Sequence, residues 1–252
     1  MNKDEKVLAY CNLFGVLGAI PTLLETVPEA RALVAEKRIS VGFQVKDGPE
    51  GTLCINNGTA RMLHGIEACN IKLYFASCKK FNDMIDGKGN PLPVSGVWHS
   101  GFLRGEFSRL TDLRSAYLRP KAEDMADPVF FERSTVLMLH VIAGAVAEIA
   151  NHDQVGRFSA SNIVDGVIKV AIANQYAVAV EAKDHMLTVL DEVPEKCFSQ
   201  MCFDSLKTAR DLFDGRINAV ASVGEGKVRI GGMISQVDNV NRILDRVAIY
   251  LA

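Results

Sequence analysis

The chain repeats itself at a spacing of 128 residues, and this internal repeat constrains its fold more than any other feature. Eight of the 21 positions from 67 to 87 carry the same residue 128 positions later, where chance gives roughly one or two. The repeat predicts one α+β unit of roughly 125 residues, present twice in tandem. The identical pairs are Glu67 and Glu195, Cys69 and Cys197, Phe75 and Phe203, Ser77 and Ser205, Lys79 and Lys207, Asp83 and Asp211, Asp86 and Asp214, and Gly87 and Gly215.

Both copies show the same predicted order of elements. An apolar helix opens each copy, and alternating apolar residues then predict a strand at 39–45 and again at 168–172. Asn57-Gly58 predicts a type I′ hairpin turn, because both central residues of that turn need a positive φ. A strand at 71–75 follows, and then a helix that Ser77 caps and Gly87 ends.

The end of each copy is predicted from a second match. Gly105 and Asp112 match Gly231 and Asp238 at a spacing of 126, which implies about two additional residues in the first copy. We therefore expect a last strand at 102–105 and at 228–231, each followed by an amphipathic helix. The glycines of Gly224-x-Gly226 are interpreted as a hairpin turn.

A linker separates the copies. Residues 119–132 contain two prolines and a charged run, and they fit neither helical nor strand periodicity. We expect domains at 1–124 and 133–252.

Composition excludes several classes of function. The net charge is −2, from 30 acidic and 28 basic residues with no block of one sign, so nucleic acid is not an expected partner. The apolar stretch 7–24 is interrupted by polar residues, glycines and a proline, so we expect no insertion into a membrane. The six cysteines form no Cys-x-x-Cys pair, and we expect reduced thiols in a cytoplasmic protein.

Four segments of the first copy resemble the sterol carrier protein type 2 (SCP2) family, in the order that the family presents them. They are Val41-Gly42-Phe43-Gln44-Val45-Lys46-Asp47-Gly48-Pro49, Asn57-Gly58-Thr59-Ala60, Asp86-Gly87-Lys88-Gly89-Asn90-Pro91 and Phe102-Leu103-Arg104-Gly105.

The resemblance covers most of residues 30–118 and implies a fold and a function. The implied fold is α+β: two SCP2-like units, each a small twisted, mostly antiparallel sheet with helices packed on one side. The implied function is non-catalytic binding or transfer of a fatty acyl chain, a sterol-like molecule or another lipid in a cavity between sheet and helices. The second copy lacks the Lys-Asp-Gly-Pro turn, and it is either a divergent binding unit or a copy without a ligand.

The family architecture also implies which side chains enclose the ligand in the first copy. Trp98 is the strongest candidate, because its Gly- and Pro-rich segment has no evident counterpart in the second copy, and His99 beside it is a candidate polar contact at the cavity mouth. For each apolar candidate, the alternative is simple packing in the core. The expected ligand-binding residues are Phe81, Met84, Ile85, Trp98, Phe102, Leu110 and Leu113.

No arrangement of residues predicts catalysis. The histidines show no metal-ligand spacing, and Cys69 and Cys197 have no histidine at a shared offset that would activate them. We therefore expect no enzyme activity, no metal and no cofactor.

The alternative function is an interaction or assembly module with filled cores. In that case the two copies pack as a pseudo-dimer along the helices that contain Gly15 and Gly144, and a homodimer is a further expectation.

Overall fold

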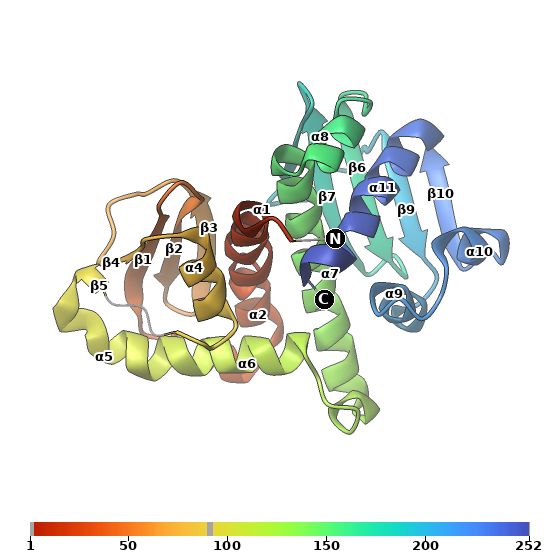
Figure 1. Ribbon diagram of the computed structural model, residues 1–252. Helices are drawn as coiled ribbons and strands as arrows, with labels where there is room; N and C mark the ends of the chain where they lie inside the picture. Colours follow the sequence, from red (N-terminus) through yellow and green to blue (C-terminus); the bar gives the residue numbers. More distant parts are fainter. Residues whose placement is uncertain (1–2, 90–92, 252) are drawn as a thin grey trace. The chain divides into compact units, whose positions relative to one another are not determined.

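The computed structural model describes residues 3–89 and 93–251, which form two compact units, Met1–Leu137 and Met138–Ala252 (Figure 1). Each unit contains one five-stranded sheet and several helices, so the predicted α+β fold is confirmed. The first unit contains α1 (Glu5–Tyr10), η1 (Cys11–Leu17), α2 (Ile20–Thr26), α3 (Pro28–Leu33), β1 (Arg38–Val45), β2 (Glu50–Asn56), β3 (Thr59–His64), β4 (Ile71–Phe75), α4 (Cys78–Ile85), β5 (Pro93–Ser95), η2 (Val97–His99), α5 (Ser100–Phe102), η3 (Leu103–Phe107), α6 (Ser108–Leu118) and η4 (Asp124–Ala126).

Helix α7 (Pro128–His152) begins in the first unit and continues into the second. Its first five residues, 128–132, lie inside the predicted linker. The prediction of irregular structure was therefore wrong for these five residues. Proline suits the first position of a helix, because its fixed φ is helical and no N–H is needed at that position. The second unit continues with α8 (Gln154–Ala160), β6 (Gly166–Ile172), β7 (Tyr176–Lys183), β8 (Met186–Val189), β9 (Ser199–Phe203), α9 (Leu206–Phe213), α10 (Ala219–Gly224), β10 (Val228–Gly232) and α11 (Ile234–Leu251).

The two sheets have the same topology. Their strand orders are β3-β2-β1-β4-β5 and β8-β7-β6-β9-β10. The central pairs, β1 with β4 and β6 with β9, are parallel, whereas the other neighbours are antiparallel. Phe43 lies opposite Leu73 in the first parallel pair, and Val170 lies opposite Met201 in the second. The sequence repeat therefore corresponds to the same pairing of residues in the central parallel strands of both sheets.

Local signals in the sequence are confirmed where they depend on nearby backbone geometry. Asn57 and Gly58 have φ values of 47° and 84° and join β2 to β3 as predicted. The hydroxyl of Ser77 accepts a hydrogen bond from the backbone N–H of Lys80, and the hydroxyl of Ser205 accepts one from that of Thr208. These serines cap α4 and α9.

The predicted last strand of the first copy is wrong. Residues 102–105 are helical and belong to a continuous helical run from Ser100 to Leu118, whose inner face buries Phe102, Phe107 and Leu110. The edge strand is instead β5, which pairs with β4 as β10 pairs with β9. The four residues 102–105 are too few for spacing alone to separate a strand from one turn of a helix.

The correct match at this end joins Gly96 to Gly232. Gly96 directly follows β5 and Gly232 is the last residue of β10, and both have a positive φ, 75° and 83°. A Cβ atom on Gly96 would lie 2.0 Å from the carbonyl oxygen of Asn70, and one on Gly232 would lie 2.2 Å from that of Phe198. The glycines are 136 residues apart, so it is the second copy that carries additional residues here, which form α10. Gly224 ends that helix and is not part of a hairpin turn.

The core of each unit includes apolar helices that a sequence search would also select as membrane spans. The stretches Glu5–Thr26 and Pro128–His152 are long and apolar enough to cross a membrane. In the structure, however, 67% and 61% of their most apolar windows are buried. Core helices have the same length and composition, so these stretches are weak evidence for a membrane span.

Candidate ligand-binding cavity

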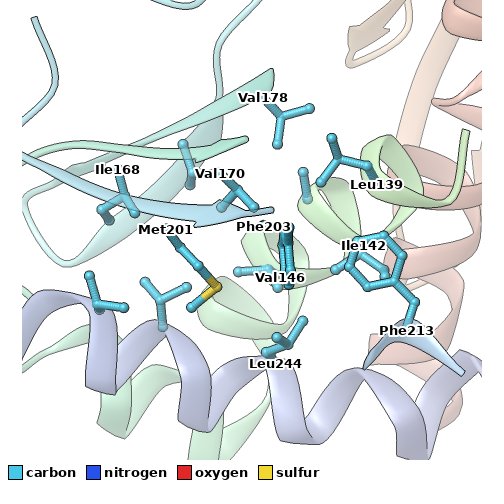
Figure 2. Close-up of a pocket in the computed structure, with 14 residues that line it drawn as sticks. Leu139, Ile142, Val146, Ile168, Val170, Val178, Met201, Phe203, Phe213 and Leu244 are labelled. Carbon is cyan, nitrogen blue, oxygen red and sulfur yellow. The ribbon is translucent and has the colours of Figure 1, made fainter. Parts of the chain in front are cut away.

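An apolar cavity of about 40 Å³ lies in the second unit, between the sheet and helices α7, α9 and α11 (Figure 2). All of the side chains that line it are apolar. A cavity of this kind stays dry, because a water molecule inside it would find no hydrogen-bond partner. The lining residues are Leu139, Ile142, Ala143, Val146, Ile168, Val170, Val178, Val180, Met201, Phe203, Phe213, Val237, Val240 and Leu244.

Helical and strand periodicity place these side chains. Leu139, Ile142 and Val146 follow one another at spacings of three and four residues, so they share one face of α7. Val237, Val240 and Leu244 do the same on α11. Alternate residues of β6, β7 and β9 complete the lining, because successive side chains of a strand point to opposite faces of the sheet.

Two phenylalanines of the first unit have smaller counterparts in the second. Phe43 and Val170 occupy equivalent positions in the two parallel strand pairs. Phe81 and Ala209 each lie four residues after the serine that caps their helix. Val170 lines the cavity, whereas Ala209 is buried and does not line it. Helix α9 instead contributes Phe213 to the lining, with its ring 5.7 Å from that of Phe203.

In the first unit these phenylalanines fill the same region. The ring of Phe81 meets that of Phe75 edge-on, with centroids 5.1 Å apart, and lies 6.4 Å from that of Phe43. Phe107 packs 6.3 Å from Phe43 on its other side, and Phe102 lies 6.1 Å from Phe107. A usable cavity in the first copy stays a prediction, whereas the apolar cavity described above lies in the second unit.

The seven predicted ligand-binding residues are not among those that line the cavity, which lies in the other unit. Phe81, Phe102 and Leu110 are buried in the core of the first unit, as the alternative interpretation had it. Met84 and Ile85 are half-buried on α4. As contacts to a ligand, these residues stay predictions.

Trp98 and Leu113 lie at the surface of the first unit. Trp98 is 84% exposed. It lies two residues after Gly96, as Ile234, which is 74% exposed, lies two residues after Gly232. The Trp98 segment therefore does have a counterpart in the second copy. Leu113 is half-buried and borders a shallow hollow between α3 and α6 that also contains charged side chains.

Charged groups gather at one end of the cavity wall, around Asp153. This carboxylate caps α8 by accepting hydrogen bonds from the backbone N–H groups of Val155 and Gly156. Burial opposes its ionisation, but the hydrogen bonds from Arg246, Tyr250 and Gly156 outweigh that effect and hold the pKa of Asp153 below its ordinary value. The same burial and the neighbouring carboxylate raise the pKa of Tyr250. Asp153 and Arg246 are therefore an ion pair at neutral pH.

The histidines and cysteines are the other candidates for reactive side chains in the described chain. His140, half-buried on α7, has its pKa lowered to about 4 by burial, so it is neutral at pH 7. Within residues 3–89 and 93–251, no three metal-binding side chains of histidine, cysteine, aspartate or glutamate come together. The six cysteines, all within the described residues, form no disulfide bond with one another.

Comparison with known proteins finds similar structures but no similar sequence. No family model and no curated protein matches the chain. A structure described as a UbiJ-SCP2 ubiquinone synthesis protein is 17% identical over 42% of this chain and 93% of its own, with a TM-score of 0.33. The sterol carrier protein domain 2 of Helicoverpa armigera is 16% identical over 44% of this chain and 88% of its own, with a TM-score of 0.36.

A third similar structure is sterol carrier protein 2 from Yarrowia lipolytica, which is 14% identical over 40% of this chain and 92% of its own, with a TM-score of 0.31. Each of these three matches covers 40–44% of this chain. All three structures are described as SCP2 or sterol carrier proteins.

Proposed function

We propose that the second unit binds an apolar ligand in the cavity between its sheet and its helices, as a non-catalytic cytoplasmic carrier. The observation that carries the proposal is the cavity itself, whose fourteen lining residues are all apolar. Such a lining offers a hydrocarbon chain or ring system dispersion contacts and removal from water. It offers no partner for a polar group, so the polar end of the ligand stays outside.

The cavity must enlarge to admit a ligand. Its volume of about 40 Å³ is well below the roughly 300–1,000 Å³ of typical ligand sites. A chain that buries some fourteen methylenes gains on the order of 11 kcal/mol, at about 0.8 kcal/mol each. Association costs at least about 4 kcal/mol, and opening the cavity costs more, so we expect micromolar affinity or weaker.

Binding is tested by titrating the full chain with cis-parinaric acid and with the fluorescent sterol dehydroergosterol. Val170→Phe places on the cavity wall the side chain that Phe43 has in the first unit, and we expect it to weaken binding at least about tenfold. Val220→Phe is the matched control, because Val220 is 77% exposed on α10. Equal affinity in all variants, or no binding of either probe by the parent chain, would refute the proposal.

For the first unit we propose a different function, because its buried phenylalanines fill the space between sheet and helices. This filled core favours the alternative made from the sequence, an interaction or assembly module. Packing of the two copies as a pseudo-dimer, and a homodimer of the whole chain, stay predictions, and sedimentation velocity of the purified chain tests the homodimer.

A further inference from the structure

Helix α11 forms one wall of the cavity, and polar contacts hold it at two places. Near its start, the side-chain amide of Gln236 donates a hydrogen bond of 2.7 Å to the backbone carbonyl of Val164. Near its end, Arg246 and Tyr250 bind Asp153. The three residues of α11 that line the cavity, Val237, Val240 and Leu244, lie between these contacts.

The contact at Asp153 is the stronger of the two. The guanidinium of Arg246 donates two hydrogen bonds to the carboxylate, at 3.1 Å from Nε and 2.7 Å from Nη2. The hydroxyl of Tyr250 donates a third, at 2.6 Å. Asp153 is 5% exposed and Tyr250 3% exposed. Paired, charge-assisted hydrogen bonds of this kind are about twice as strong as neutral ones, and burial protects them from screening by salt.

The position of Asp153 links two walls of the cavity. It directly follows His152, the last residue of α7, which supplies lining residues from the opposite wall. The ion pair therefore joins the end of α7 to the second half of α11. At the spacing of 129 residues that relates Gly15 to Gly144, Asp153 corresponds to Leu24, which is buried in the first unit. The unit with the cavity thus has an ionic contact where the filled unit has an apolar side chain.

We propose that Asp153, Arg246 and Tyr250 form a latch that positions α11 and limits how quickly the cavity opens to exchange its ligand. The proposal rests on the proposed function of the second unit. The sheet cannot widen without losing ladder hydrogen bonds, whereas a helix packed on it can shift as a body. Displacing α11 from the sheet is then the route to a larger cavity, and the latch is the polar barrier on that route.

The test uses Asp153→Asn, which removes the charge but keeps a good capping residue for α8. Tyr250→Phe is a milder second variant that loses one hydrogen bond and keeps the ring. Asn218→Ala is the matched control, because it removes the cap of α10, which lines no part of the cavity. Hydrogen exchange of α11 amides without ligand measures the latch, and stopped-flow release of cis-parinaric acid measures ligand exchange.

We expect about tenfold faster amide exchange in α11 and about tenfold faster release for Asp153→Asn, because a hydrogen bond to a charged group contributes about 1.5–3 kcal/mol. Tyr250→Phe should show a smaller effect in the same direction, and Asn218→Ala should show neither. Faster amide exchange with unchanged release would overturn the gating role alone. Unchanged amide exchange in both variants would overturn the latch. Absence of probe binding by the parent chain would instead refute the proposed function, and the gating role with it.

Discussion

Removing the Phe81 side chain should convert the filled first unit into a hollow one. Phe81 is fully buried, and its ring contacts those of Phe75 and Phe43. Truncation of a buried phenylalanine to alanine usually costs about 3–5 kcal/mol, and each aromatic contact adds about 0.5–1.5 kcal/mol beyond its buried area. We expect Phe81→Ala to lower the free energy of unfolding of the first unit by about 4 kcal/mol.

Hydrogen exchange resolved by mass spectrometry is the suitable assay, because it reports on amides of each of the two compact units separately. Amides of β1 and β4 that exchange only on unfolding of the unit should exchange about a thousandfold faster, since about 1.4 kcal/mol corresponds to a factor of ten. Benzene should partly restore the protection in Phe81→Ala, as it enters apolar cavities made by such truncations.

Phe213→Ala is the matched control for this prediction. Phe213 is half-buried and already borders the cavity of the second unit, so the same truncation there removes fewer contacts. We expect a loss roughly half as large, confined to the second unit. A loss below about 1 kcal/mol for Phe81→Ala, or equal losses for the two variants, would refute the assignment of Phe81 to a filled core.

Three further predictions concern buried or constrained residues. Burial lowers the pKa of His140 from 6.5 to about 4, so protonation of this side chain destabilises the folded state as the pH falls from 6.5 to 4. Urea unfolding should show that the free energy of unfolding falls by about 3 kcal/mol over this range. In His140→Leu this pH-dependent loss should disappear. Gly232→Ala and Gly96→Ala should each lower the melting temperature measured by circular dichroism, because a Cβ atom meets a carbonyl oxygen at a positive φ. Arg114→Met should raise the urea midpoint of the first unit, because the buried Nε and Nη1 atoms of Arg114 have no hydrogen-bond partner among the described residues.

The parts of the fold that sequence predicted depend on interactions between near neighbours. The turn at Asn57-Gly58 and the caps at Ser77 and Ser205 are of this kind, because a few adjacent residues determine each one. The edge strand of the first unit was missed, because β5 has only three residues and its pairing with β4 is not a local property. A match of identical glycines then placed that strand at residues 102–105, which are helical.

The cavity could not be predicted from periodicity, because both copies have apolar residues at the same positions. What differs between the copies is the volume of the side chains at these positions. A difference in side-chain volume indicates a cavity only when the two positions are known to be equivalent in the two cores. The aligned repeat carries size differences in both directions: with Ser77 placed on Ser205, Phe81 falls on Ala209, but Ile85 falls on Phe213. Side-chain sizes along that alignment therefore do not locate the cavity in one copy.

The two copies show two ways of holding a helix against the same kind of sheet. In the first unit, Phe102 and Phe107 anchor the helical run 100–118 through ring contacts that reach Phe43. A unit with a cavity has fewer such dispersion contacts, and its helix would be held less firmly by packing alone. The ion pair of Asp153 with Arg246 supplies the missing attachment at the end of α11, outside the apolar lining. If the second unit binds a ligand as proposed, a polar contact there holds the wall without filling the space.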